Sequence, residues 1–114
     1  MSIKVSTRQL DQVTIVDLSG RITLGEGSSL LRETVKDLVG KGQKNILLNL
    51  GDITYIDSSG IGELVSSFTS VSNQGGRLKL LNLQKKVHDL LQITKLYTVF
   101  EVHTDEASAV RSYS

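Results

Sequence analysis

The stretch Ile56-Asp57-Ser58-Ser59-Gly60-Ile61-Gly62 separates two segments with different hydrophobic patterns. Before it, residues 45–50 form a short apolar run that is typical of a central strand covered on both faces. After it, apolar residues recur every three or four positions from Ile61 to Val71, which predicts one face of an amphipathic helix. The stretch is therefore a strand-to-helix junction that carries a carboxylate, two hydroxyls and two glycines.

Strand and helix patterns alternate along the rest of the chain. Residues 3–8 and 13–18 read as two strands joined by a turn, which predicts an N-terminal hairpin. Ser19-Gly20 is expected to break the second strand, and residues 21–24 are compatible with one short extended piece. The later predicted elements are a helix that opens at 25–29 with a serine cap and stops at 40–42, a strand at 77–82, a helix around 87–91, a short strand at 98–103 and a closing helix at 105–113 capped near Asp105.

Helices that alternate with strands require crossover connections, so the predicted fold class is α/β with about four helices and a mostly parallel sheet. The N-terminal hairpin makes that sheet mixed. With 114 residues, 39% of them hydrophobic, the chain fits one globular domain over residues 1–114. Aromatic residues make up only 4% of the chain, so we expect an aliphatic core.

Composition narrows the functional classes. The chain has no cysteine, which excludes disulfides and thiol chemistry. Its net charge of +1 argues against nucleic-acid binding, and the basic residues at 77, 79, 85 and 86 are expected to form a solvated face. No apolar run approaches the roughly 20 residues needed to cross a bilayer. Because Met1 to Val5 lacks the apolar core of a secretory signal, we expect a cytoplasmic monomer without membrane contact.

The junction does not resemble a catalytic site. A nucleophilic serine needs a base, and neither His88 nor His103 lies in a local motif with Ser58. The G-x-S-x-G pattern is absent because Ile56 stands two residues before Ser58. The histidines have no carboxylate at a useful helical spacing, and Gly25-Glu26-Gly27 lacks the spacing of a phosphate-binding loop. We therefore expect no catalytic residue, metal or cofactor, and hence no enzyme.

Two interpretations of the junction remain. Asp57, Ser58 or Ser59 can cap the following helix, a contribution of about 1 kcal/mol. Alternatively, a serine can receive a phosphate from another protein, because the N–H groups at a helix N-terminus favour an anion. The carboxylate of Asp57 opposes that second interpretation by repulsion. A phosphate would add a charge of roughly −1.5 to −2 to the surface, which suits a switch in binding.

On these residues the chain resembles the STAS domain, and within it the stand-alone bacterial anti-sigma factor antagonists. The resemblance covers essentially the whole sequence. Its most specific part is the Asp57-Ser58-Ser59-Gly60 block with Ile61-Gly62 after it. The other matching features are Gly20 at the end of the second strand, Gly27-Ser28 at a helix start, Ile46 to Leu50 before the block, and Gly75-Gly76 before the next strand.

The resemblance implies a partner switch. In that family the unmodified protein binds an anti-sigma factor that is also a GHKL-type serine kinase, and the sigma factor is released. The kinase then phosphorylates the serine directly after the aspartate, here Ser58 with Ser59 as the alternative, and the complex dissociates. A PP2C-type phosphatase resets the protein. The other function implied by the family is a regulatory subunit without phosphorylation, for example of a phospholipid-transport complex.

The resemblance also implies which residues meet the partner. The expected partner-binding residues are Thr23, Asp57, Ser58, Ser59, Gly60, Gly62 and Glu63. Gly60 and Gly62 are expected to leave the helix start open to a kinase cleft. Glu63, together with the serines at 66, 67 and 70, is expected to face solvent. Thr23 is a departure, because antagonists often carry an aspartate at this position.

Overall fold

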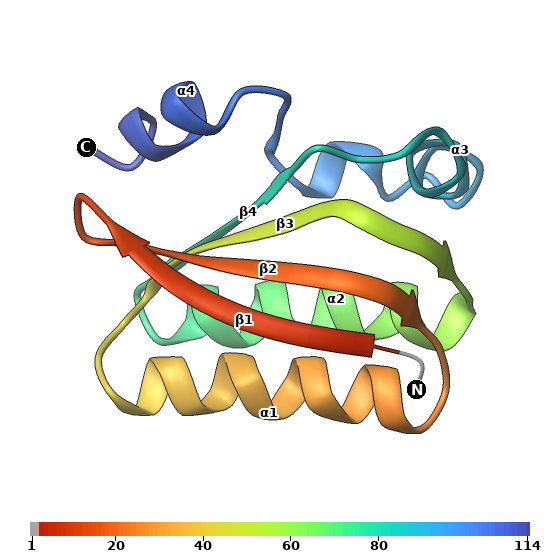
Figure 1. Cartoon of the computed structure of the whole chain (residues 1–114), viewed down its shortest axis with the longest axis horizontal. Helices are drawn as coiled ribbons and strands as arrows, with labels where there is room; N and C mark the ends of the chain where they lie inside the picture. Colours follow the sequence, from red (N-terminus) through yellow and green to blue (C-terminus); the bar gives the residue numbers. More distant parts are fainter. Residues whose placement is uncertain (1–2) are drawn as a thin grey trace.

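The computed structural model describes residues 3–114 and has three layers, with a β-sheet between two layers of helices (Figure 1). Met1-Ser2, which entered the argument against a secretory signal, lies outside the described residues. The elements in chain order are β1 (Ile3–Leu10), β2 (Val13–Ile22), α1 (Glu26–Gly40), β3 (Asn45–Ile56), α2 (Ser58–Asn73), β4 (Arg77–Leu81), α3 (Lys85–Ile93), the 3₁₀ helix η1 (Tyr97–Val99), β5 (Val102–His103) and α4 (Glu106–Arg111).

The sheet is mixed, as the sequence predicts. Its strand order is β1-β2-β3-β4-β5, with β1 and β2 antiparallel and the other neighbours parallel. The hairpin turns at Asp11 and Gln12, which have φ angles of 51° and 68°. Two left-handed residues in a two-residue turn match the twist of the flanking strands. Helices α1 and α2 lie together on one face of the sheet, and α3 and α4 lie on the other (Figure 1).

Three predicted boundaries differ from the structure. Strand β2 continues through Ser19-Gly20 to Ile22, with shifts in its register against β3, so the predicted break is an irregularity within the strand. Strand β3 extends to Ile56, well beyond residue 50. The expected strand at 98–103 is reduced to the two residues of β5, because residues 97–99 form a 3₁₀ turn. In contrast, the predicted closing helix is confirmed, with Asp105 as its cap.

The core is aliphatic, as expected, and it consists of two clusters of buried residues. The larger cluster joins the sheet to α1 and α2 and also includes Val87, Leu91 and Phe100 from the segment after β4. Each fully buried leucine or isoleucine contributes about 1.5–3 kcal/mol. The smaller cluster packs α4 and the C-terminal residues against the other face; its members are Val13, Ile15, Leu47, Leu81, Ala109, Val110 and Tyr113.

The predicted solvated basic face is wrong for Lys79, whereas Arg77 is exposed as expected. Lys79 is buried under the C-terminal segment, where its Nζ donates to the Ser112 carbonyl oxygen at 3.1 Å and lies over the Tyr113 ring. Arg77 donates to the Tyr113 carbonyl oxygen. Lys85 and Lys86 are exposed as expected. No helix in the described part of the chain is long and apolar enough to span a membrane.

Candidate functional site

Helix α2 begins directly after Asp57, at the carboxyl end of β3. The backbone of Asp57 is extended, and its Oδ1 accepts a hydrogen bond from the Gly60 N–H at 2.8 Å. This bond satisfies one of the free N–H groups at the helix start. The capping interpretation is therefore confirmed for Asp57. The hydrogen bond from Gly60 also lowers the pKa of the Asp57 carboxyl, so this group is ionised at neutral pH.

Asp57 also connects α2 to the loop between β2 and α1. Its second carboxylate oxygen, Oδ2, accepts from the Leu24 N–H at 3.1 Å, and its own N–H donates to the Ile22 carbonyl oxygen at 3.3 Å. Thr23 lies between these two contacts, and its carbonyl oxygen accepts from the backbone N–H and the hydroxyl of Ser28. Two of the predicted site residues, Thr23 and Asp57, thus meet at one edge of the sheet.

The sequence predicts a serine cap for α1, the helix that follows this loop, but no side chain caps this helix. Gly25 occupies the cap position of α1 and has a φ of 94°, a left-handed backbone that favours glycine. The Ser28 hydroxyl bonds back to Thr23 across the loop. The predicted serine cap is therefore wrong, because this hydroxyl stabilises the loop before the helix.

The two glycines of the junction differ in their surroundings. A Cβ on Gly60 would lie 2.2 Å from the Ile22 carbonyl oxygen and 2.6 Å from Cγ1 of Ile56. Gly60 is buried, and only a residue without a side chain allows α2 to approach β2 this closely. A Cβ on Gly62 would meet no atom within 4 Å, and Gly62 is exposed. The space beside Gly62 is therefore open, as expected, whereas the space beside Gly60 is filled by β2 and by Ile56; contact of either glycine with a partner stays a prediction.

The two serines of the junction are the first two residues of α2. Ser58 is exposed and Ser59 is half-buried. Each histidine makes its contacts elsewhere: the His88 ring packs edge-on against Tyr97, and the His103 Nε2 lies 2.6 Å from Glu101 Oε2. Glu101 reaches His103 without a helical spacing, because residues two apart on an extended segment share a face. Ser58 remains the predicted phosphate acceptor, with Ser59 as the alternative.

Glu63 does not face solvent, which corrects the sequence prediction. Its side chain is 6% exposed, and its Oε1 accepts from Arg32 Nε of α1 at 3.0 Å. Its Oε2 accepts from the Ser67 hydroxyl at 3.3 Å, and the Ser67 side chain is also buried, contrary to the prediction that it faces solvent. A buried carboxylate needs such partners to offset the loss of hydration. Glu63 therefore joins α1 to α2, whereas the serines at 66 and 70 are exposed as predicted.

Two apolar residues beside the junction were missed by the sequence analysis. The Leu24 side chain is 79% exposed and that of Tyr55 is 44% exposed. Arg21, which pairs with Tyr55 across β2 and β3, places its guanidinium 5.1 Å from the centre of the Tyr55 ring. Leu24 has one sequence signal: it is the last apolar residue of the extended piece expected at 21–24 and stands directly before Gly25.

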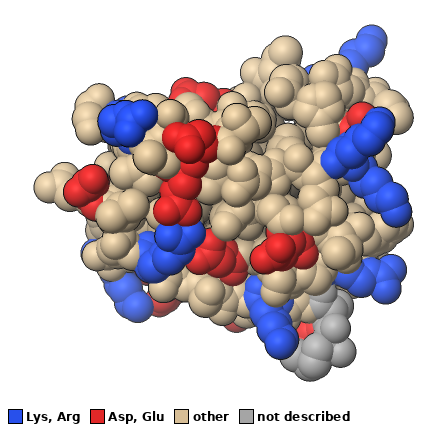
Figure 2. Space-filling model, turned by 45° about the horizontal axis from the view of Figure 1, so that its top comes forward, with Lys and Arg blue, Asp and Glu red and all other residues tan. Residues whose placement is uncertain are grey.

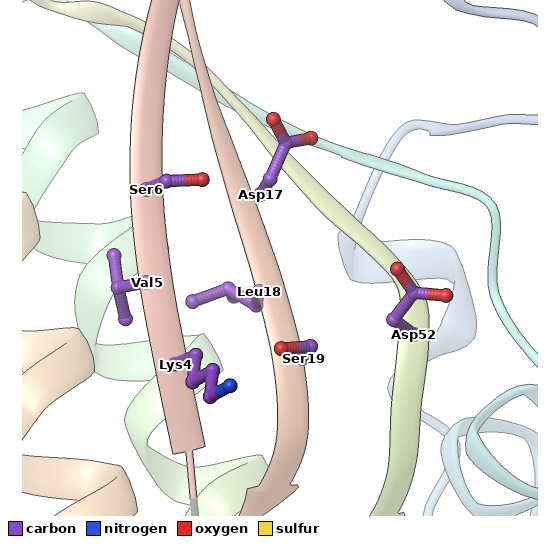
Figure 3. A pocket seen from close by; sticks show the side chains of 7 residues that line it. All are labelled: Lys4, Val5, Ser6, Asp17, Leu18, Ser19 and Asp52. Carbon is purple, nitrogen blue, oxygen red and sulfur yellow. The ribbon is translucent and has the colours of Figure 1, made fainter.

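Two other surface features involve the outer face of the sheet and the distribution of charge. A shallow hollow crosses β1, β2 and β3, with Val5 and Leu18 at its base and the polar side chains of Lys4, Ser6, Asp17, Ser19 and Asp52 around it (Figure 3). Acidic and basic side chains are interspersed on the face shown in Figure 2, in keeping with a net charge of +1. None of the predicted site residues lines the hollow.

The fold and the junction together define a small α/β domain that presents a serine at the start of a helix. The STAS domain family matches residues 4–109, and the chain belongs to this family. The anti-sigma-B factor antagonist of Bacillus subtilis (strain 168) is 32% identical over 111 residues, covering 97% of this chain and 100% of the relative. The anti-sigma F factor antagonist of Paenibacillus polymyxa is 24% identical and covers 96% and 94% of the two chains.

Solved structures confirm the fold. The phosphorylated form of the Bacillus cell fate determinant SpoIIAA superposes with a TM-score of 0.75 at 18% sequence identity, covering 97% of this chain and all of SpoIIAA at 100%. At this identity the likeness shows the fold alone. The resemblance inferred from the junction residues is thus confirmed at the level of the family, and the named relatives are anti-sigma factor antagonists.

Proposed function

We propose that this chain is an anti-sigma factor antagonist that is switched by phosphorylation of Ser58. The unphosphorylated form binds an anti-sigma factor that is also a GHKL-type serine kinase, and this binding frees a sigma factor. The kinase transfers the γ-phosphoryl group of ATP to the Ser58 hydroxyl, which leaves ADP and a phosphoserine. A PP2C-type phosphatase hydrolyses the phosphoserine and restores binding. This cycle places the protein in the cytoplasm, where sigma factors act.

The observation that supports this proposal most is the exposure of Ser58 on a rigid support. Asp57 caps the helix immediately before Ser58, and the buried Gly60, two residues after Ser58, anchors the helix to β2. A phosphoryl group on Ser58 would therefore change the surface charge without requiring the helix to move. The helix N-terminus tolerates an added anion, and the neighbouring Asp57 carboxylate adds to its negative field.

The same charge explains how phosphorylation would end binding. An added charge of roughly −1.5 to −2 in a close interface is repelled by acidic groups and must be desolvated. A loss of about 4 kcal/mol converts nanomolar binding to micromolar binding. In this proposal the chain is a ligand and a substrate, not an enzyme, since both histidines are engaged with residues outside the junction.

The test begins with the anti-sigma factor kinase of the same organism, purified and incubated with this chain and ATP. We expect one phosphate per chain, located on Ser58 by mass spectrometry, and none on Ser58→Ala. Ser59→Ala is the matched control and should still be phosphorylated. Equal phosphate uptake by Ser58→Ala would contradict the assignment of the acceptor.

Calorimetry with the same kinase tests the switch itself. Ser58→Asp should weaken binding, whereas Ser59→Asp, one position along the helix and half-buried, tests whether any added charge in the junction has this effect. Unchanged affinity of Ser58→Asp and of the phosphorylated chain would contradict a charge-based switch. Recovery of a transporter ATPase in place of the kinase in pull-downs would favour the regulatory subunit of a phospholipid-transport complex.

A further inference from the structure

The loop between β2 and α1 holds an exposed leucine in a fixed backbone. The Leu24 N–H is bound by Asp57 Oδ2 at 3.1 Å, and the preceding carbonyl oxygen, of Thr23, accepts two hydrogen bonds from Ser28. Gly25 then turns the chain with a φ of 94°. The backbone is therefore constrained on both sides of Leu24, while its side chain is 79% exposed.

Exposure alone would not single out Leu24, because isolated apolar residues are common on protein surfaces. Ile93 of α3 is exposed to nearly the same extent, at 77%. Leu24 differs because its backbone is bound by the residue immediately before Ser58. Tyr55, half-exposed under Arg21, stands two residues before Asp57 on the adjoining end of β3. The exposed Leu24 is thus tied through its backbone to the residue before Ser58, and the exposed Tyr55 lies near the end of the strand that leads into this junction.

A fixed loop suits recognition for an energetic reason. Binding requires that contact groups be ordered, and a group that is already ordered avoids this entropy cost. Apolar and aromatic anchors that insert into a partner's pocket carry most of the affinity of typical interfaces. Leu24 satisfies both conditions, because hydrogen bonds hold its backbone in place and its apolar side chain is exposed to a partner.

We propose that Leu24 is a specificity-determining contact for the anti-sigma factor kinase, and that Asp57 is the positioning residue that presents Leu24 beside Ser58. This inference rests on the proposed function. The two carboxylate oxygens of Asp57 have separate tasks: Oδ1 caps α2, and Oδ2 holds the Leu24 loop. The partner inserts Leu24 into an apolar pocket next to its phosphoryl-transfer cleft, which brings the Ser58 hydroxyl to ATP.

The first test measures the affinity of the purified kinase for three variants by calorimetry. Leu24→Ala should weaken binding about tenfold or more, as expected for an interface anchor. Ile93→Ala, the control with matched exposure on the other side of the sheet, should change it by less than about twofold. Leu24→Met, which keeps an apolar side chain of similar size, should restore most of the affinity. Equal effects of Leu24→Ala and Ile93→Ala would overturn the assignment.

Kinetics of phosphorylation provide a readout that a loss of folding would not reproduce. In Leu24→Ala the Ser58 hydroxyl and its cap are unchanged, so KM for the chain should rise while kcat stays near that of the unmodified sequence. A fall in kcat at unchanged KM would mean that Leu24 acts on the chemical step and would overturn its role as a binding contact.

The positioning role of Asp57 is tested by removing one acceptor. Asparagine caps helices as well as aspartate does but has a single acceptor oxygen, so Asp57→Asn should keep the bond from Gly60 and lose that from Leu24. Hydrogen exchange at the two amides should show Leu24 deprotected and Gly60 protected. If the amide oxygen of Asp57→Asn accepts from Leu24 and not from Gly60, Asp57→Ala, which removes both acceptors, replaces Asp57→Asn in the comparison.

The kinase affinity of these variants decides the inference. An Asp57 variant that loses the hydrogen bond from Leu24 should bind the kinase more weakly than the unmodified chain. The same Asp57 substitution added to Leu24→Ala should lower the affinity of that variant little further, because both substitutions act through one contact. Additive losses would overturn the positioning role. If the unmodified chain neither binds the kinase nor accepts phosphate, the proposed function fails and this inference with it. If it does both while Leu24→Ala matches Ile93→Ala, only this inference fails.

Discussion

Helices α2 and α4 lie on opposite faces of the sheet, and both begin with an aspartate cap. Asp57 accepts from the Gly60 N–H and Asp105 accepts from the Ser108 N–H, each at 2.8 Å. The caps are locally equivalent, but the helices are attached to the sheet by different means. Backbone proximity holds the start of α2, where Gly60 leaves no room for a side chain. Helix α4 is held by its buried Ala109 and Val110 and also by polar and charged side chains.

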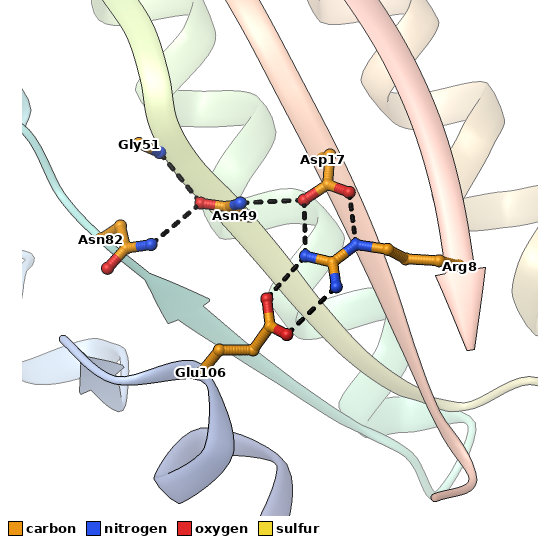
Figure 4. A network of polar contacts seen from close by, with 6 residues as sticks. All are labelled: Arg8, Asp17, Asn49, Gly51, Asn82 and Glu106. Carbon is orange, nitrogen blue, oxygen red and sulfur yellow. Dashed lines mark hydrogen bonds and ion pairs between the residues drawn. The ribbon is translucent and has the colours of Figure 1, made fainter. Parts of the chain in front are cut away.

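The attachment of α4 is a network that reaches across the sheet (Figure 4). Arg8 of β1 bridges Asp17 of β2 and Glu106 of α4, with a closest distance of 2.6 Å to each carboxylate. Asp17 in turn accepts from Asn49 of β3 at 2.8 Å. At the end of the chain, the Tyr113 hydroxyl donates to the Ile46 carbonyl oxygen.

The difference shows how one sheet supports two kinds of surface. The polar side chains that hold α4 are already engaged within the protein. Where their ion pairs are exposed, solvent screening reduces the interaction energy. At the start of α2, the close approach of Gly60 to β2 and the Asp57 carboxylate hold the helix, and the side chains of Ser58 and Leu24 remain exposed. The predictions below test this contrast, beginning with the largest expected effect.

Gly60→Ala should strongly destabilise the protein, by about 3 kcal/mol or more, since its Cβ would collide with the β2 backbone. Gly62→Ala is the matched control two residues on. A methyl group there meets no atom within 4 Å, and alanine favours a helix over glycine by about 0.5–1 kcal/mol. Urea denaturation measures both. Similar stabilities of the two variants would mean that α2 is not seated by backbone proximity.

Tyr113→Phe should cost about 1–2 kcal/mol, because it removes the hydrogen bond to Ile46 and leaves the ring in place. The control is Tyr97→Phe, whose ring packs against His88 and should keep that contact. If α4 is held by polar side chains, Tyr113→Phe should also increase hydrogen exchange in α4 more than in α2. An equal increase in hydrogen exchange in both helices would contradict the different attachment of α2 and α4.

Arg8→Ala should have a smaller effect, about 1 kcal/mol or less, because the Arg8 side chain is 44% exposed and solvent screens its ion pairs. Lys4→Ala, on the same face of β1, is the control and should be close to neutral. The loss in Arg8→Ala should shrink in high salt. A loss that does not depend on salt would point to packing by the arginine side chain.

The pH dependence should be the smallest effect and should involve the same network. Hydrogen bonds from Arg8 lower the pKa of the Asp17 carboxyl, and likewise that of Glu106. Carboxyls with a lowered folded-state pKa stabilise the fold above their unfolded value of about 4, and this stability is lost as the pH falls through the folded value. The stability gap between the unmodified chain and Arg8→Ala should therefore narrow below about pH 4. A gap that stays constant to lower pH would exclude these ion pairs as its source.

Local patterns in the sequence were sufficient for the frame of this protein. A period of two predicted the hairpin, helical spacing predicted α1 and α2, and small polar residues before an apolar stripe predicted a capped helix after β3. These features depend on neighbours within a few residues. The same range of interactions explains why the α/β class, the strand-to-helix junction and the cap near Asp105 were predicted correctly, and why Asp57 was among the three candidate caps of α2; the choice of Ser58 over Ser59 came from the family resemblance alone.

Tertiary structure decided everything that depends on partners distant in the chain. Glu63 and Lys79 read as solvated charges, but Arg32 and Ser112, each about 30 positions away, bury them with compensating hydrogen bonds. Gly60 read as a clearing for a partner, yet the Ile22 backbone occupies the space beside it. The hydrogen bond that the Leu24 N–H donates to Asp57 joins two segments far apart in the sequence, so no local pattern predicts it. Such contacts arise only when the crossover between parallel strands brings their ends to one edge.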